Sequence, residues 1–308
     1  MAANDAPTDH PRAPVPPTGV IGLGDIGRGV AGMLAHAGVE LTVCDVRPEA
    51  TDPFRPGARV APSPNEVAAR CDVVVVAVVD DAQVRSVVTG PDGLLSAGRP
   101  GVAVVLLSTV SRDTVVEVAA EADRHGVSLV DCGVSGGPRA AAEGELVCMV
   151  GGSPEAVARV RPVLDVLGSL VLHMGPLGAG LSAKLARNLV QYGSWLAAYE
   201  AQVLAEAAGI PLPLLAQAIR ESDRLIGGAS TLMFRQTARP LQPDVATDAG
   251  LIGPMSAGSK LAHKDLGAAI ALADALGVDA PLARLTEAYC DRVFGVSEAG
   301  GAEGAGGR

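Results

Sequence analysis

The sequence predicts an α/β domain with a doubly wound, mainly parallel sheet, followed by an all-α domain. The first half alternates short β-branched runs with amphipathic helical stretches, which is typical of a parallel sheet covered by helices. Beyond Gly180 this alternation stops, and the remaining sequence has the pattern of helices interrupted by glycine and proline. The expected strands are Thr18–Leu23, Glu40–Asp45, Val73–Val79, Val102–Ser108, Ser128–Asp131, Leu146–Val150 and Leu170–Met174.

Two features shape the expected helices. Ser153-Pro154 is a helix N-cap followed by proline at the first helical position, so a helix should separate the last two strands. Leu181 to Ala208 contains no proline and is apolar nearly all round, which predicts a long and deeply packed helix. Helices after it should break at Gly227-Gly228, Pro240, Pro243 and Pro254.

The long helix also bears on assembly. A helix that is apolar on every side needs more cover than one small domain supplies, so we expect a homo-oligomer. The alternative is a monomer that wraps its own C-terminal helices around this one. The residues expected to be covered include Trp195, Leu196, Tyr199 and Leu204.

Composition excludes several classes of partner. The net charge is -10, and the 24 Lys and Arg residues are scattered rather than clustered, so we expect neither nucleic-acid nor membrane-surface binding. No apolar run reaches the roughly 18–20 residues that span a bilayer, and the N-terminus has no signal segment, which predicts a soluble, cytoplasmic protein. The five cysteines lack paired metal spacing, so we expect buried, reduced thiols and no metal site.

A glycine-rich turn follows the first strand. The segment Gly22-Leu23-Gly24-Asp25-Ile26-Gly27 leads directly into a helix. Glycines at this spacing allow a tight turn, close approach of a pyrophosphate to the backbone, and tight packing of helix on strand. The pattern predicts a dinucleotide-binding Rossmann domain with these six residues at the cofactor; the alternative is a purely structural turn.

Asp45 ends the second strand, about 20 residues after the turn, where an acid binds the adenine ribose hydroxyls. A carboxylate repels the 2′-phosphate of NADP, so Asp45 favours NAD. Arg47 could bind that phosphate instead, which keeps NADP open. The expected organisation is a disordered Pro-rich tail (1–17), the dinucleotide-binding domain (18–178), an all-α substrate and oligomerisation domain (179–296) and a disordered Gly-rich tail (297–308).

A long segment from Asp131 to Gly152, with the sequence DCGVSGGPRAAAEGELVCMVGG, resembles the substrate-loop motif of the 3-hydroxyacid dehydrogenase family. Three further segments match that family in order, and the resemblance covers about residues 18 to 295. These segments are Gly22–Gly27, Gly178–Asn188 and His263–Leu266.

The resemblance implies a site for a carboxylate and a proton donor. It assigns Ser135, Gly136 and Gly137 to the substrate carboxylate, Lys184 to general acid/base catalysis and Asn188 to orienting the substrate. The residues themselves agree, because positions four apart share one helix face. The chain also has only three lysines, and it uses arginine, which cannot give up its proton near neutral pH, for its other cations.

Three more residues are implied at the nicotinamide end of the cofactor: Val79, Thr109 and Lys264. Val79 and Thr109 follow strands whose ends face the cofactor crevice, although both could be strand-end residues without a ligand. Lys264 precedes Asp265 at the start of an apolar helical stretch, and the alternative is a first-turn surface pair.

The chain departs from the family in two places near the nicotinamide. Leu106 stands where an aspartate is frequent, and residues 255–261 lack the usual aromatic, so this pocket should differ. Gln191 stands where the sugar-phosphate branch of the superfamily has a glutamate, and that branch's large C-terminal extension is missing. We therefore do not expect 6-phosphogluconate as the substrate.

The predicted function is an NAD(P)-dependent oxidoreductase that transfers a hydride between nicotinamide and a small 3-hydroxy acid or its semialdehyde. The alternatives are an imine reductase and a catalytically silent dinucleotide-binding module. Lys184 counts against both, because imine reductases of this type generally replace the lysine and a silent module has no use for it. The residues do not identify the 3-hydroxy acid or the physiological direction.

Overall fold

A computed structural model of the chain describes residues 14–235 and 237–296. The predicted tails therefore fall largely or wholly outside the described residues, since 1–13 and 297–308 are not among them. The chain divides into two compact units after Arg187, within a long helix, whereas the sequence suggested a boundary at 178/179. None of the described helices is long and apolar enough to cross a membrane.

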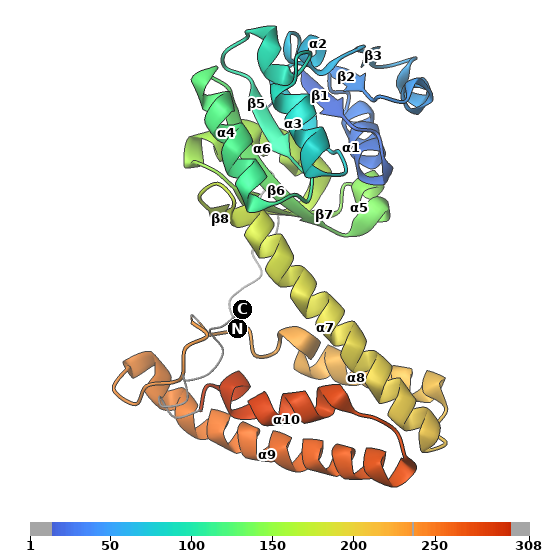
Figure 1. Ribbon diagram of the computed structural model, residues 1–308, viewed down its shortest axis with the longest axis vertical. Helices are drawn as coiled ribbons and strands as arrows, with labels where there is room; N and C mark the ends of the chain where they lie inside the picture. The colour runs from blue at the N-terminus through green and yellow to red at the C-terminus, as the bar shows by residue number, and fades with distance from the viewer. Residues whose placement is uncertain (1–13, 236, 297–308) are drawn as a thin grey trace. The chain divides into compact units, whose positions relative to one another are not determined.

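The first unit contains a single eight-stranded sheet (Figure 1). The strand order is 3-2-1-4-5-6-7-8, and all neighbours are parallel except the sixth and seventh strands. The predicted doubly wound, mainly parallel sheet is confirmed. The strands are β1 (Thr18–Ile21), β2 (Leu41–Cys44), β3 (Arg59–Val60), β4 (Val73–Val76), β5 (Ala103–Leu106), β6 (Ser128–Ser135), β7 (Leu146–Gly151) and β8 (Gly168–Gly175).

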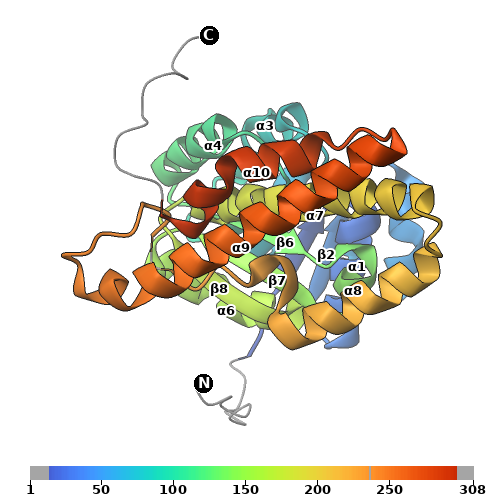
Figure 2. The same cartoon turned by 90° about the horizontal axis from the view of Figure 1, so that it is seen from below.

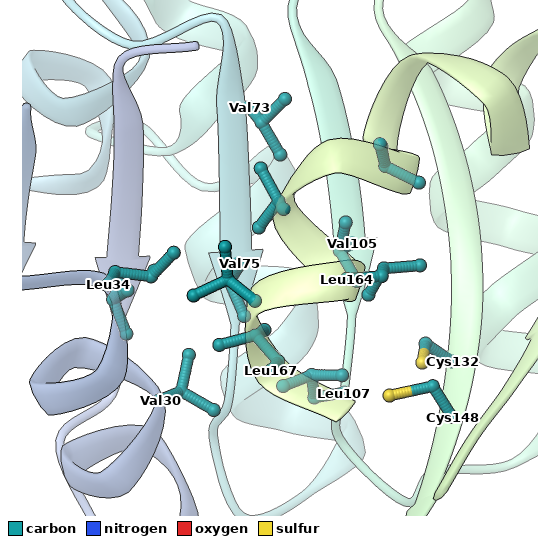
Figure 3. Packing of buried hydrophobic residues seen from close by; sticks show 14 of the residues in the cluster. Val30, Leu34, Val73, Val75, Val105, Leu107, Cys132, Cys148, Leu164 and Leu167 are labelled. Carbon is teal, nitrogen blue, oxygen red and sulfur yellow. The ribbon is translucent and has the colours of Figure 1, made fainter. Parts of the chain in front are cut away.

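Helices cover both faces of this sheet. The α-helices of the first unit are α1 (Asp25–His36), α2 (Pro64–Ala68), α3 (Asp81–Thr89), α4 (Arg112–Arg124), α5 (Gly137–Glu143), α6 (Pro154–Leu167) and the start of α7 (Ala179–Ala207). Figure 3 shows Leu34 of α1 and Leu164 of α6 on one face of the sheet, in the same cluster as Val75 of β4 and Val105 of β5. Helices α2, α3 and α4 pack on the other face. Burial on both faces explains why β4 is a run of four valines rather than an alternating strand.

Two local signals read from the sequence are confirmed. Ser153 caps α6 by accepting a hydrogen bond from the Ala156 amide at 3.2 Å, and Pro154 occupies the first turn. Gly227, in the left-handed region, ends the helix after Ile226. The short strand β3 is not among the predicted strands, because two residues are too few to show a period of two.

The second unit is helical, as the sequence predicts. Apart from α7, its α-helices are α8 (Leu212–Ile226), α9 (Ala246–Leu276) and α10 (Pro281–Phe294). Helices α9 and α10 lie side by side (Figure 2). The expected break at Pro254 is wrong, because α9 continues through it. The residue before it is Gly253, which has no Cβ to clash with the proline ring, so a helical conformation is tolerated there.

The expected deep packing of α7 is also wrong for a single chain. Leu181 is buried in the first unit, but Trp195, Leu196 and Tyr199 expose half or more of their surface. Leu204 is half-buried. The apolar pattern of this helix therefore does not reflect burial within one protomer.

Candidate functional site

The glycine-rich turn joins β1 to α1 at the carboxyl edge of the sheet. Gly22 has φ = +87°, a conformation that favours glycine, and Gly24 is the N-cap residue of α1. A Cβ on Gly24 would meet nothing within 4 Å, whereas a Cβ on Gly27 would overlap the Gly22 carbonyl and lie 2.9 Å from its carbon. Gly22 thus allows the tight turn, Gly24 leaves the backbone open, and Gly27 allows α1 to pack closely on the turn. This geometry suits a pyrophosphate.

Asp45 follows β2 and points at this turn. Its Oδ2 accepts a hydrogen bond from the Leu23 amide at 2.6 Å, and its Oδ1 accepts from the Arg47 amide at 2.8 Å and from Arg47 Nε at 3.1 Å. Burial raises the pKa of Asp45, but the hydrogen bonds from Arg47 and Leu23 outweigh burial and hold the pKa below its ordinary value. A negative charge therefore stands beside the turn, with Arg47 paired to it.

A cavity of about 350 Å³ opens at the same edge of the sheet. It is lined by the turn, by the ends of β4, β5 and β6, and by the start of α7. Seven residues that the sequence singled out meet here, although they are spread over 160 positions from Gly24 to Lys184. They are Gly24, Asp25, Ile26, Val79, Thr109, Gly137 and Lys184.

Lys184 lies on the second turn of α7, and its amine faces the end of β6. Lys184 Nζ donates a hydrogen bond to the carbonyl oxygen of Val134. Partial burial, and then the positive charge of Arg187, lowers the pKa of Lys184 below its ordinary value. An ammonium whose pKa is lowered gives up its proton more readily, as a general acid/base requires.

The next residues after Val134 are the predicted carboxylate loop. Ser135 ends β6 and is buried, while Gly136 and Gly137 have φ = +124° and +73°. A Cβ on Gly137 would meet nothing within 4 Å, so the backbone there is open. The structure thus brings the lysine and this loop together at one strand end.

The loops after β4 and β5 are tied to each other. Ser108 Oγ accepts a hydrogen bond from the Val78 amide at 3.0 Å, and Asp81 accepts from the Ser111 amide and hydroxyl at 3.1 and 2.6 Å. Hydrogen bonds from Ser111 and Thr114 lower the pKa of Asp81 to about 2. This link holds Val79 and Thr109 beside one cavity. Asp81 was not among the predicted site residues, although two acids in a row after a buried strand are a signal.

Asn188 and Lys264 belong to the second unit. Lys264 lies well inside α9, not at the start of a helical stretch as expected, and it pairs with Asp265 at 3.1 Å. Its side chain is 71% exposed. Helix α9 begins earlier than expected because Pro254 does not interrupt it.

The site residues fit a dinucleotide. The open backbone at Gly24, the N-terminus of α1 and the acid after β2 are the features that receive a pyrophosphate and a ribose. They adjoin a cavity large enough for a nicotinamide and a small substrate.

Comparison with known proteins agrees with this geometry. Residues 17–175 match the family described as the NAD-binding domain of 6-phosphogluconate dehydrogenase. Residues 178–304 match the NAD-binding region of NADP-dependent 3-hydroxyisobutyrate dehydrogenase. Together the two families account for nearly all of the chain.

Relatives match over most of their length. An uncharacterised oxidoreductase of Mycobacterium tuberculosis is 42% identical over 279 residues, which is 90% of this chain and 92% of the relative. The NAD-dependent L-serine dehydrogenase of Pseudomonas aeruginosa is 32% identical, with 90% of this chain and 94% of the relative covered. The 3-hydroxyisobutyrate dehydrogenase of the same organism is also 32% identical, with coverage of 86% and 88%.

Solved structures share the fold. The crystal structure of a Mycobacterium avium protein, provisionally described as an oxidoreductase, has a TM-score of 0.82 at 40% identity. The match covers 91% of this chain and 99% of that protein. The 3-hydroxyisobutyrate dehydrogenase of M. tuberculosis, solved with L-serine, has a TM-score of 0.64 at 29% identity, with coverage of 90% and 93%. An imine reductase of Myxococcus stipitatus has a TM-score of 0.71 at 23% identity, with coverage of 89% and 92%, which is a likeness of fold alone.

The matches support a nicotinamide cofactor and a hydroxy-acid dehydrogenase, and the turn with Asp45 fits that cofactor. The chain belongs to the 3-hydroxyacid dehydrogenase family and is an NAD(P)-dependent oxidoreductase of the 3-hydroxyisobutyrate dehydrogenase type.

Proposed function

We propose that this enzyme interconverts a small 3-hydroxy acid and its semialdehyde, with Lys184 as the general acid/base. The observation that carries the proposal is the position of Lys184. Its amine has a lowered pKa and lines the same cavity as the phosphate-binding turn, next to the loop at Ser135. The named relatives act on 3-hydroxyisobutyrate and L-serine. In both compounds the carbon that bears the hydroxyl is separated from the carboxylate carbon by one further carbon.

Each group has a separate role in this proposal. The backbone and hydroxyl of Ser135, Gly136 and Gly137 bind the substrate carboxylate. Asn188, one helical turn after Lys184, orients the substrate hydroxyl. Val79, Thr109 and Lys264 contact the nicotinamide half, and Gly22–Gly27 with Asp45 hold the adenosine and pyrophosphate.

The proton and the hydride leave the substrate separately. When bound, the nicotinamide ring of NAD(P)⁺ would supply the acceptor for the hydride of the carbinol carbon. Neutral Lys184 accepts the hydroxyl proton as the C–H bond breaks, which leaves the aldehyde and an ammonium. In reduction the same ammonium donates its proton to the developing alkoxide. Charge balances in both directions without a further group.

We further propose NAD as the preferred cofactor and a homo-oligomer as the working form. Asp45 is ionised beside the turn, where it repels a 2′-phosphate, and Arg47 is already paired with it. The exposed Trp195, Leu196 and Tyr199 on α7 are apolar surface that a second copy of the chain would cover.

A substrate panel with lysine variants tests the function. NAD⁺ reduction is measured with 3-hydroxyisobutyrate, L-serine and 2-(hydroxymethyl)glutarate, with lactate as a 2-hydroxy acid control. Lys184→Ala should lower kcat by about 10²–10⁴ while leaving the Kd for NADH unchanged, since a proton carrier is lost but no cofactor contact. Lys184→Arg should not restore turnover, because guanidinium keeps its proton.

The controls separate the rival functions. Lys260→Ala removes an exposed lysine of α9 and should keep wild-type turnover. Near wild-type turnover of Lys184→Ala would overturn the catalytic assignment. Faster reduction of 1-pyrroline than of any semialdehyde would support an imine reductase, and NADH binding with no turnover of any substrate would support a silent module.

A further inference from the structure

Asp131 is a fully buried acid in the middle of the family motif, and it has no role in the function proposed above. It lies on β6 with none of its surface exposed. Its Oδ1 accepts a hydrogen bond from the Gly178 amide at 2.6 Å, and its Oδ2 accepts one from the Leu181 amide at 2.7 Å. Both donors belong to the first turn of α7 or the residue before it.

A buried carboxylate is costly unless its charge is compensated. Here the compensation comes from two amides that have no partner within the helix and from the positive end of the helix dipole. The pairing also works in the other direction, because Asp131 is the group that satisfies the N-terminus of α7. A residue nearly 50 positions upstream therefore serves as the helix cap.

Glycines let this first turn lie directly on the strands. A Cβ on Gly133 would stand 2.5 Å from Lys184 Cβ and 2.8 Å from the Gly180 oxygen. A Cβ on Gly180 would stand 2.7 Å from the backbone carbonyl oxygen of Asp131, and one on Gly151 would stand 2.8 Å from the backbone nitrogen of Gly180. Backbone thus packs on backbone, with little space for α7 to slide along β6 and β7.

Lys184 follows the capped turn by one helical step. The Cβ of Lys184 is held by the close contact of α7 with β6. Its Nζ donates a hydrogen bond to the carbonyl oxygen of Val134, which is also on β6. One strand therefore holds the helix at Asp131, holds the amine at Val134 and continues into the loop at Ser135.

We propose that Asp131 is a positioning residue that sets the distance between the Lys184 amine and the substrate-binding end of β6. The proposal rests on the catalytic role proposed for Lys184. Its physical reason is that proton transfer needs donor and acceptor within hydrogen-bond reach, so that a displacement of about 1 Å costs about 10²-fold in rate.

Asp131→Asn is the sharpest variant. Asparagine keeps the shape but turns one acceptor into an NH₂ group that faces a backbone N–H, so the first turn of α7 loses a hydrogen bond and is pushed away. With the best substrate of the panel, kcat should fall about 10–10²-fold while KM for NAD⁺ stays within about twofold. Ser153→Ala is the matched control: it removes the cap of α6 in the same unit and should leave kcat unchanged.

A double-mutant cycle shows whether Asp131 acts through the lysine. If it does, Asp131→Asn should cost little further turnover in the Lys184→Ala background, because there is no amine left to misplace. An equal loss in both backgrounds would make Asp131 a structural residue only and overturn the proposal. Wild-type kcat in Asp131→Asn would overturn it too, whereas wild-type kcat in Lys184→Ala would instead remove the proposed function on which it rests.

A second variant covers the case in which Asp131→Asn does not fold. Gly133→Ala adds one methyl group to an extended strand and removes no polar group, yet it displaces the Lys184 Cβ. It should lower kcat about tenfold or more with KM for NAD⁺ unchanged. Wild-type kcat in this variant would contradict the requirement for precise placement of α7.

Discussion

Two glycines of the phosphate-binding turn should respond to the same substitution in opposite ways. Gly24→Ala adds a methyl group that meets no protein atom within 4 Å, at a residue that lines the cavity. Gly27→Ala adds one that overlaps the Gly22 carbonyl and lies 3.3 Å from Ala77 Cβ. The first change should therefore act on cofactor binding and the second on folding.

The magnitudes follow from these distances. The backbone of Gly24 (φ = -67°, ψ = -167°) is accessible to alanine, so the free energy of unfolding should change by less than about 1 kcal/mol. The methyl group takes the place of the approaching pyrophosphate, and we expect a 10–10²-fold higher Kd for NADH, or about 1.4–2.7 kcal/mol. Gly27→Ala must push α1 off β1, which costs about 1–3 kcal/mol as for other overpacked cores.

Calorimetric titration with NADH and thermal unfolding without it separate the two effects. Gly27→Ala should lower Tm by about 2–4 °C for each kcal/mol lost, while Gly24→Ala should keep the wild-type Tm. Gly32 of α1, whose Cβ would also meet nothing within 4 Å, gives the control variant Gly32→Ala, which should bind NADH normally. Wild-type NADH affinity in Gly24→Ala would refute this account of the turn, as would a Tm loss equal to that of Gly27→Ala.

Three further predictions concern cofactor choice, pH and assembly. The wild-type enzyme should prefer NAD over NADP by about tenfold in kcat/KM, about 1.4 kcal/mol, and Asp45→Asn should narrow the gap because the 2′-phosphate is no longer repelled. A wild-type preference for NADP would mean that Arg47 binds the phosphate. Oxidation should speed up as pH rises through a midpoint below the ordinary lysine value of 10.5, because Lys184 must be neutral to accept the proton; reduction should slow through the same midpoint. Flat profiles from about pH 6 to 10 would contradict the role of Lys184. Light scattering at micromolar concentration should give at least twice the 30.9 kDa of one chain, and a clean monomer would refute assembly through α7.

The sequence indicated much of the site because its signals are local. A glycine turn with its acid at Asp45 needs only one strand-helix-strand unit, and short patterns of this kind survive in any context. Strand ends such as Val79 and Thr109 could be placed at one edge because parallel strands end on the same side. The structure places both beside the cavity that Lys184 lines.

Other features depend on residues that are far apart in the chain. The apolar pattern of α7 could not show that Trp195 and Tyr199 are exposed in one protomer, because the pattern is the same for a core helix and for an interface. Proline by itself predicts a helix break at Pro254. The helix continues nevertheless, because helical residues flank it on both sides and the preceding residue is Gly253.

The sequence alone indicated the strands of the sheet apart from β3, the glycine-rich turn after β1 and the helical second half, since each depends on residue types within a short window. Only the tertiary structure decided that Asp131 caps α7 and that Val134 holds the amine of Lys184. Both contacts join residues about 50 positions apart. The physical reason is that hydrogen-bond partners and close backbone approaches depend on how β6 and α7 meet in space, and no local period or propensity encodes that meeting.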